Sequence, residues 1–442
     1  MKVLLTGASG FMGSRLRQAL LEAGHHVVAV ARHARPSASE PARLQWLALD
    51  FTQATTPAQW LAHLQGVDAV VNAVGIFRES GSQTFDALHH RAPAALFQAC
   101  AQAGVRRVIQ ISALGVQAGA TAYQRSKHAA DEALLSLPLD ATVVQPSLVF
   151  GEDGPSARFF LSLASLPLLA LPRSGPLQPV HVDDAVAAVV ALLRAPVARW
   201  SGRRVPLVGP QPLPLAEYLQ ALRAAQGLPR APVLRVPAPL GALGARVAGA
   251  LGSTLLDADS WDMLQQGNAA PADGITALLG RAPRPPRDFI PRGRADAARA
   301  HARLAWTLPL LRLSLALVWL ITAVVSFGLY PVQKSYELLG RTGVPPALQP
   351  LMLYGACGLD LLLGVLTVWP LRPRARRRLW AAQALLIAFY TVLITWRLPE
   401  FWLHPYGPLS KNLPILAALA LLAALEPGDP RDRPPPPAPE AR

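Results

Sequence analysis

The stretch VLLTGASGFMGSRLRQALLEAG, residues 3–24, holds the strongest fold signal of the 442-residue chain. Val3–Leu5 predicts a short buried strand, and the segment after the glycines has the apolar spacing of a helix. In the turn between them, Gly7 permits a tight bend, Gly10 lets a pyrophosphate approach the backbone, and Gly13 lets the helix pack closely on the strand. A strand, a glycine-rich turn and a helix in this order predict a dinucleotide-binding unit.

Further apolar runs predict more strands, each followed by a residue suited to a ligand site. HHVVAVA precedes Arg32, LQWLAL precedes Asp50, VDAVV precedes Asn72 and RRVIQI precedes Ser112. Because strands and helical segments alternate, we expect an α/β fold with a parallel, doubly wound sheet of the Rossmann type, whose ligand lies at the carboxyl ends of the strands. We therefore expect Asp50 beside the adenine and Asn72–Gly75 along the inner edge of the cofactor.

The end of the second predicted strand indicates which dinucleotide is bound. Arg32 and His33 stand where an NAD-binding protein usually has an acid that holds the ribose 2′-hydroxyl, and Arg35 is close by. An arginine suits the 2′-phosphate of NADP instead. We expect NADP(H) to be preferred, with NAD(H) as the alternative if Arg32 is only a solvated arginine in an arginine-rich chain.

The stretch TAYQRSKHAA, residues 121–130, places Tyr123 and Lys127 four positions apart. The chain has only four lysines, and about 0.06 such pairs are expected by chance. The surrounding residues predict a helix, so the two side chains share one face. A lysine cation near a phenol favours the phenolate, and lysine can also reach the cofactor ribose. We expect Tyr123 to carry a proton and Ser112 to orient a carbonyl or hydroxyl group; the alternative is a helix-surface pair.

These motifs resemble the short-chain dehydrogenase/reductase superfamily over about residues 1–290, together with QPSLVFGEDG (145–154) and QPVHVDDAVAAVV (178–190). The YxRSK form and the short serine-to-tyrosine spacing are similar to the atypical branch that contains the nucleotide-binding accessory subunit of respiratory complex I. The resemblance implies Ser112, Tyr123 and Lys127 as catalytic residues. It implies cofactor contacts from Gly7, Ser9, Gly10, Phe11, Met12, Gly13, Arg32, Asp50, Phe51, Asn72, Val74, Gly75, Lys127 and Pro146.

One departure from the superfamily bears on the substrate. Only ten residues separate Ser112 from Tyr123, whereas sugar-nucleotide epimerases and dehydratases usually have a longer insertion there. No pair of acids that would serve a dehydratase is recognisable beside Ser112. An epimerase or dehydratase function is therefore a secondary alternative.

The composition argues against two other kinds of site. The net charge of +15 comes mainly from arginine, but the basic residues form no long stripe interleaved with aromatic residues. Nucleic acid is therefore not an expected partner. Cys100 and Cys357 are far apart in the chain and form no metal or redox motif, so we expect no metal site.

Four apolar stretches of about bilayer length follow a Pro/Arg-rich linker at residues 291–306. They are Leu308–Tyr330, Leu348–Pro370, Leu379–Trp396 and Leu409–Leu425. Their lengths, with HPYGPLSKNLPILAAL at residues 404–419, resemble the DoxX-like family of four-helix membrane domains. We expect an all-α membrane domain over residues 307–426 and a disordered tail over residues 427–442.

The loop charges predict how this domain is oriented. Nine basic residues lie in the linker segment 292–303 and in the loop LRPRARRRL, against four in the two other loops. Because basic loops stay on the cytoplasmic side, we expect both termini and the nucleotide domain in the cytoplasm, anchored to the inner membrane.

Two charged residues lie inside predicted membrane helices, Arg312 in the first and Asp360 in the second. Charges in the hydrocarbon layer are costly, so such residues usually face one another or a polar cavity. Both fall in the cytoplasmic half of the predicted topology. We expect Arg312 and Asp360 to form a structural clamp between helices; a quinone or proton site is the alternative.

The leading hypothesis is a membrane-tethered, NADPH-dependent oxidoreductase that acts on a hydrophobic carbonyl or quinone-like substrate. Membrane lipid and membrane redox partners are expected around it. The rival is a non-catalytic nucleotide-binding module that stabilises a membrane electron-transfer assembly. Ser112, Tyr123 and Lys127 favour the enzyme, because a structural module has no need of a phenol beside a lysine.

Overall fold

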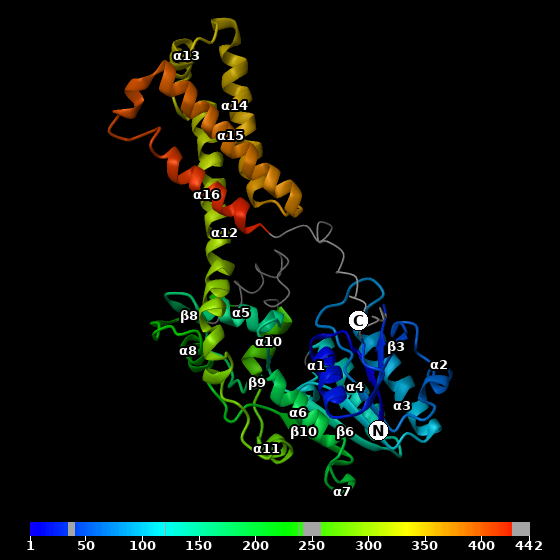
Figure 1. Cartoon of the computed structure of the whole chain (residues 1–442). Coiled ribbons are helices and arrows are strands. Elements are labelled where there is room, and N and C mark those ends of the chain that lie inside the picture. Colours follow the sequence, from blue (N-terminus) through cyan, green and yellow to red (C-terminus); the bar gives the residue numbers. More distant parts are fainter. Residues whose placement is uncertain (34–39, 120, 238, 242–257, 427–442) are drawn as a thin grey trace, which may run out of the picture. The chain divides into compact units, whose positions relative to one another are not determined.

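The computed structural model describes residues 1–33, 40–119, 121–237, 239–241 and 258–426. Arg35 and the predicted tail at 427–442 lie outside the described residues. The chain divides into two compact units, Met1–Arg303 and Leu304–Arg442, each with its own apolar core (Figure 1).

The described residues of the first unit form a seven-stranded sheet in the order β10-β6-β5-β4-β1-β2-β3. The strands are β1 (Lys2–Thr6), β2 (His26–Ala31), β3 (Leu44–Ala48), β4 (Ala69–Asn72), β5 (Arg107–Ile111), β6 (Asp140–Pro146) and β10 (Arg203–Leu207). All neighbouring pairs run parallel. The strand order reverses at β1, between β2 and β4, which is where open α/β sheets bind their ligands.

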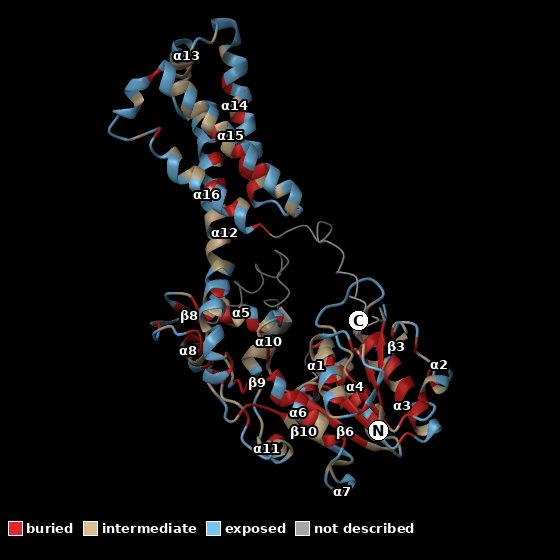
Figure 2. Ribbon diagram, viewed as in Figure 1, coloured by how far each residue is buried: buried red, intermediate tan, exposed pale blue. Residues whose placement is uncertain are grey.

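Helices cover both faces of this sheet, which confirms the doubly wound prediction. One core packs α1 (Phe11–Glu22), α6 (Val182–Leu192) and α11 (Asp273–Leu279) on the sheet, and the other packs α2 (Ala58–Leu61), α3 (Ala92–Ala103) and α4 (Ala122–Leu135). Figure 2 shows the buried residues of the unit gathered along the strands and the helices beside them. Strands covered on both faces explain the nearly continuous apolar runs in β1 and β2.

A smaller lobe with its own core follows β6. Its short strands pair as β7 (Val149–Phe150) with β9 (Val180–His181), and β8 (Leu169–Leu171) with β11 (Val233–Arg235). Phe150, Tyr218 and Phe289 are fully buried in its core. Further helices in the described part of the unit are α5 (Pro155–Ala164), α7 (Val197–Trp200), α8 (Leu215–Ala225) and α10 (Ala258–Gln266).

The second unit is helical. Its described helices are α12 (Ala295–Val324) from Leu304 onward, α13 (Val332–Arg341), α14 (Gln349–Val368), α15 (Pro373–Arg397) and α16 (Asn412–Leu425). Among the described residues, three segments are long and apolar enough to cross a membrane, Arg292–Leu329, Pro346–Val368 and Pro373–Arg397. The fourth predicted stretch contains α16, which has 14 residues. That helix is about 21 Å long, shorter than a hydrocarbon layer of about 30 Å.

Residues 295–306 differ from the predicted linker, because they are the first part of α12. Their sequence, ADAARAHARLAW, has six alanines and two arginines, which favour helix. A π-helical segment, Val325–Leu329, follows α12.

The helical unit is apolar outside and locally polar inside. Ile321, Leu361 and Leu385 are at least half exposed, and Figure 2 shows exposed residues along most of α14 and α15. Inside, Trp319 Nε1 donates to Gln383 Oε1 at 3.0 Å, and Gln383 Nε2 donates to Thr367 Oγ1 at 2.8 Å. This buried chain of hydrogen bonds joins α12, α15 and α14.

The expected clamp between Arg312 and Asp360 is wrong. Arg312 Nη2 instead contacts Glu426 Oε2 at 3.2 Å, and Arg376 Nη1 contacts Glu426 Oε1 at 2.8 Å. The Glu426 side chain is 0% exposed and also accepts from Trp380 Nε1 at 3.4 Å. Glu426 directly follows α16 and is the last residue of the predicted membrane domain; the sequence offered no reason to pair it with Arg312. Its two arginines make it the charge partner that helix α12 required.

Candidate active site

The glycine-rich turn between β1 and α1 has the shape that a phosphate cradle needs. Gly7 has φ +64°, and a Cβ added there would lie 2.7 Å from the carbonyl oxygen of Ala73. A Cβ on Gly13 would lie only 2.0 Å from the Gly7 oxygen, so no larger residue fits without a backbone shift. No side chain of the described residues caps α1 at Gly10. The first amides of α1 therefore remain available to an anion.

The residues at the tip of this turn are placed for such a contact. Ser9 and Gly10 are exposed, and Phe11 and Met12 are half-buried at the start of α1. The Phe11 ring lies against the loop after β7, since a Cβ on Gly151 would be 2.7 Å from it.

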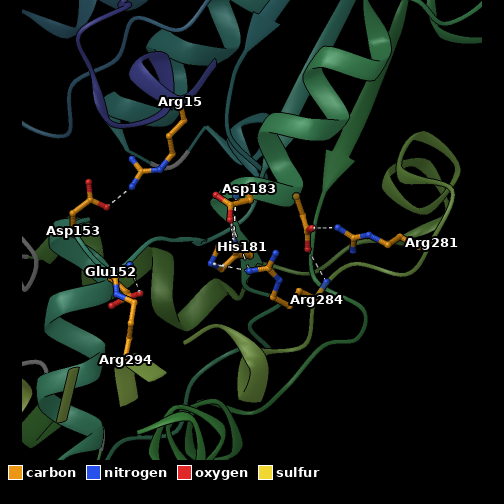
Figure 3. A network of polar contacts seen from close by, with 9 residues as sticks. Arg15, Glu152, Asp153, His181, Asp183, Arg281, Arg284 and Arg294 are labelled. Carbon is orange, nitrogen blue, oxygen red and sulfur yellow. Dashed lines mark hydrogen bonds and ion pairs between the residues drawn. The ribbon is translucent and has the colours of Figure 1, made fainter. Parts of the chain in front are cut away.

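Arg15 closes this side of the turn. Its guanidinium lies over the Phe11 ring at 4.6 Å, and Nη2 contacts Asp153 Oδ1 at 2.5 Å. Figure 3 shows Arg15 and Asp153 pointing toward one another, with the Glu152–Arg294 and His181–Asp183–Arg284 contacts nearby. The first pair joins α1 to the FGEDG loop, the second joins that loop to Arg294, and the third set joins the start of α6 to Arg284.

Helix α4 presents Tyr123 and Lys127 as predicted. Thr121 caps the helix, and its capping box with Gln124 fixes where the helix begins. Lys127 is 4% exposed, and its Nζ donates to the carbonyl oxygens of Val74 and Ile111, both at 3.2 Å. These bonds hold the lysine at the carboxyl ends of β4 and β5. Within the described residues they leave one of its three N–H groups for a cofactor hydroxyl.

The electrostatics of Tyr123 correct the expectation of a favoured phenolate. Burial, with a contribution from Asp131, raises the pKa of Tyr123 above its ordinary value. Burial also lowers the pKa of Lys127 to about 8, against the opposing effect of Asp131. The ammonium is directed at backbone carbonyls, so Tyr123 keeps its proton at neutral pH.

Asp131 is a residue of the site that the sequence reasoning missed. Ser112 Oγ donates to Asp131 Oδ2 at 2.6 Å, and Asp131 is 0% exposed. Its Oδ1 atom has no hydrogen-bond partner among the described residues. Burial raises the pKa of Asp131 to about 6. The spacing of Tyr123, Lys127 and Asp131 by four residues each was the available signal, because it places all three on one helix face.

The bond to Asp131 also changes the role expected for Ser112. Its hydroxyl hydrogen points to the carboxylate while Asp131 is ionised, so Ser112 then offers only lone pairs to a ligand. When Asp131 is protonated, the carboxyl group can donate to Ser112 Oγ, and the serine hydrogen becomes free for a substrate oxygen.

His89 is a second residue that the sequence did not reveal. It lies in a π-helical segment, Asp86–Arg91, where Nε2 accepts from the Ile76 amide at 2.9 Å and Nδ1 lies 3.0 Å from Ser126 Oγ. Burial, with the nearby Lys127 charge, lowers the pKa of His89 to about 2, so the imidazole is neutral. Its ring meets Tyr123 edge-on at 5.4 Å.

Two aromatic rings complete the surroundings of Tyr123. Phe77 stacks on its face at 5.6 Å and 18°, and Phe85 meets it edge-on at 5.9 Å. Phe77 is 81% exposed. The approach to the tyrosine is therefore apolar.

Several of the residues expected along the cofactor lie at or near the carboxyl ends of β4 and β6. Asn72 is fully buried; Thr6 Oγ1 donates to its Oδ1 at 2.5 Å, and its Nδ2 donates to Gln110 at 2.6 Å. This side chain fixes the ends of β1, β4 and β5, and its contact with the cofactor stays a prediction. Gly75 is exposed beside Lys127, Val74 is half-buried, and Pro146 is buried at the end of β6.

The adenine end differs in detail from the prediction. β3 ends at Ala48, and Asp50 is exposed two residues later, where it accepts from the Thr52 amide at 2.9 Å. The Phe51 side chain is 5% exposed and packs against Trp60 in the core at 5.2 Å. Arg32 is exposed directly after β2.

Two family matches cover the two units of the chain. Residues 7–164 match a family described as NAD(P)H-binding, and residues 316–420 match the DoxX-like family. Ceramide reductase of Caulobacter vibrioides is 26% identical over 201 residues, which are 44% of this chain and 62% of that protein.

A second relative and a solved structure add to these matches. NADH dehydrogenase (ubiquinone) 1 alpha subcomplex subunit 9, mitochondrial, of Arabidopsis thaliana is 31% identical over 202 residues, 42% of this chain and 49% of that protein. The chain thus spans about half to three fifths of these curated relatives. The crystal structure of gox2253 has a TM-score of 0.50 at 23% identity and covers 68% of this chain and 98% of that one, a likeness of fold alone.

The glycine cradle, the parallel sheet and these matches lead to one assignment. The chain joins an NAD(P)-binding Rossmann domain at its N-terminus to a DoxX-like membrane domain at its C-terminus, with ceramide reductase and complex I subunit 9 among its homologues.

Proposed function

We propose that the protein is a membrane-anchored oxidoreductase that uses NADPH to reduce a carbonyl or quinone-type group of a hydrophobic substrate. The observation that carries the proposal is the grouping of Tyr123, Lys127 and Ser112 at the carboxyl ends of β4 and β5. The glycine turn fits a dinucleotide, because a Cβ at Gly7 or Gly13 would collide with backbone atoms.

The residues divide the chemistry as follows. The bound nicotinamide would supply a hydride to the carbonyl carbon. Tyr123 donates its proton to the carbonyl oxygen, and its raised pKa suits donation because the phenol is protonated at neutral pH. Lys127 holds the cofactor ribose with its remaining N–H group. Ser112 can donate to the substrate oxygen when Asp131 is protonated and its own hydroxyl hydrogen is free.

Apolar surroundings support a hydrophobic substrate. Phe77 covers the Tyr123 face while 81% exposed, a position in which a substrate chain could shield it from water. One relative is named for reduction of ceramide, which is a membrane lipid. A DoxX-like membrane domain beside the Rossmann domain would keep the enzyme where such substrates are dissolved. We place the Rossmann domain on the cytoplasmic side, from the loop charges.

A non-catalytic role in a membrane electron-transfer assembly is the second candidate. It is favoured by the 31% identity to a subunit of NADH dehydrogenase. In that role the protein would bind NADPH to stabilise the assembly and would catalyse no reaction. The epimerase or dehydratase alternative has one new observation on its side, the single carboxylate of Asp131 beside Ser112.

One experiment separates these candidates. The full chain in lipid nanodiscs is assayed for NADPH oxidation against a panel of apolar ketones and quinones, with Tyr123→Phe as the test variant. Loss of the proton donor should lower turnover by about 10²–10⁴-fold while NADPH still binds. Tyr406→Phe, at an exposed tyrosine of the helical unit, is the control. Tight NADPH binding without turnover by the unmodified protein favours the structural module, and unchanged turnover in Tyr123→Phe removes Tyr123 from the mechanism.

A further inference from the structure

Asp360 lies on the inward face of α14. Cys357 and Gly364, three and four positions away, lie on this face; Cys357 is 5% exposed, and a Cβ on Gly364 would meet Leu320 of α12 at 2.8 Å. Thr367, seven positions on, is 3% exposed. Leu361, by contrast, is 50% exposed on the outer face. Helical spacing therefore directs the Asp360 carboxyl group into the helical unit and away from the lipid.

Asp360 is also deep in the apolar layer. It is the twelfth of the 20 residues of α14. At 1.5 Å per residue it lies about 17 Å from the first residue of that helix and about 12 Å from the last. Both surfaces of a hydrocarbon layer about 30 Å thick are therefore farther from Asp360 than its side chain can reach.

The register of α14 and α15 places Tyr390 at the same level. The two helices are consecutive, are joined by four residues and lie side by side (Figure 1). Their antiparallel register is fixed by the bond from Gln383 to Thr367. Seven residues back from Thr367 is Asp360, and seven residues on from Gln383 is Tyr390, which is half-buried. Tyr390 and Cys357 are the titratable groups within electrostatic range of Asp360.

Among the residues that the structure describes, none forms an ion pair with Asp360. Arg312, the expected partner, is bound to Glu426. On α13, Arg341 pairs with Glu400, and Lys334 forms no ion pair with Asp360. In the described helical residues 304–426, Asp360 has neither an ion pair nor a hydrogen bond, and a carboxylate without a partner in an apolar medium takes up a proton.

We propose that Asp360 is a proton-binding site of the helical unit, a carboxylic acid that is held neutral between α14 and α15 beside the Tyr390 phenol. The site is separate from the Rossmann domain and does not depend on the proposed reduction. Glu426 is its contrast within the same unit. The Glu426 carboxyl group belongs to the same unit, but two arginines contact it.

The test uses dicyclohexylcarbodiimide, which reacts with protonated carboxyl groups in apolar surroundings. The full chain in phosphatidylcholine nanodiscs is treated at pH 6, 7 and 9, and the labelled peptides are identified by mass spectrometry. We expect label on Asp360 at pH 7, a fall in labelling toward pH 9, and no label on Glu426. Asp360→Asn should lose the label from that peptide.

A second carboxyl at the same depth provides the control. Leu361→Glu in the Asp360→Asn background places an acid one residue away on the lipid-facing side of α14. The proposal is overturned if the reagent labels the glutamate of this variant but does not label Asp360 in the parent protein. If neither residue is labelled, infrared difference spectra between the parent and Asp360→Asn decide at pH 7. The carbonyl stretch of a protonated acid in the parent supports the site, and its absence overturns it.

Discussion

Replacing Glu426 with glutamine tests the charge cluster that holds three helical elements together. The side chain is 0% exposed and accepts from Arg312 at 3.2 Å and from Arg376 at 2.8 Å. Glutamine keeps the shape but removes the negative charge, so two guanidinium groups that are 25% and 20% exposed face one another without compensation. Removing one partner of a buried ion pair costs about 3–5 kcal/mol.

This loss should be visible in thermal unfolding of the full chain in detergent. For a unit of this size, about 3–5 kcal/mol corresponds to a fall of roughly 10 °C in the midpoint. Glu400→Gln is the matched control, because Glu400 pairs with Arg341 at the surface and both side chains are 53% exposed. Surface pairs contribute little, so the control should stay near the parent midpoint.

A double variant then identifies the partner. Arg312→Leu with Glu426→Gln should lose less than the sum of the two single variants, since it removes a charge from both sides. Arg312→Leu with Asp360→Leu should show no such recovery, because these residues do not touch. The reasoning is refuted if Glu426→Gln is as mild as Glu400→Gln, or if recovery occurs with Asp360 and not with Glu426.

Three further outcomes are expected in the first unit. Gly13→Ala should lower the unfolding free energy in urea by about 1–3 kcal/mol and abolish NADPH binding. Gly10→Ala should fold normally, because its Cβ would lie 3.2 Å from the nearest atom. Equal losses of stability in the two variants would contradict the packing argument. NADPH should raise the thermal midpoint more than NADH does, and Arg32→Ala should narrow the difference; equal shifts in the parent would remove Arg32 from 2′-phosphate recognition. Because the pKa of Asp131 is raised from 3.8 to about 6, the native state binds this proton more tightly than the unfolded state does. The contribution of Asp131 to the unfolding free energy therefore decreases as the pH rises from about 4 to about 6. Asp131→Asn should remove that slope relative to the parent, and identical slopes would show that the carboxyl group is not desolvated.

The sequence determined the features that depend on near neighbours in the chain. The strand, the glycine turn and helix α1 follow from residues 3–24, and Gly13 could be assigned its packing role because helix and turn are only a few residues apart. Tyr123 and Lys127 share a face because helical periodicity is local. The apolar helices were readable as well, since a membrane span is recognised by length and composition.

Tertiary structure decided which distant groups meet. Ser112 and Asp131 are 19 residues apart, and their bond depends on how α4 packs on β5. That packing also favours a retained phenol over the expected phenolate, because burial and the Asp131 charge both raise the pKa of Tyr123.

The charged residues of the helical unit are the clearest case in which the sequence alone does not determine the contacts. Arg312 and Glu426 are separated by 114 positions, and the sequence led us to expect Asp360 as the partner of Arg312 because both fall in the cytoplasmic half of the predicted topology. Hydropathy gives the depth of a residue but not its direction around a helix or the neighbour that it faces. Only the packing of α12, α15 and the end of α16 brings the arginines to Glu426, and the same packing leaves Asp360 beside a tyrosine without a counter-charge.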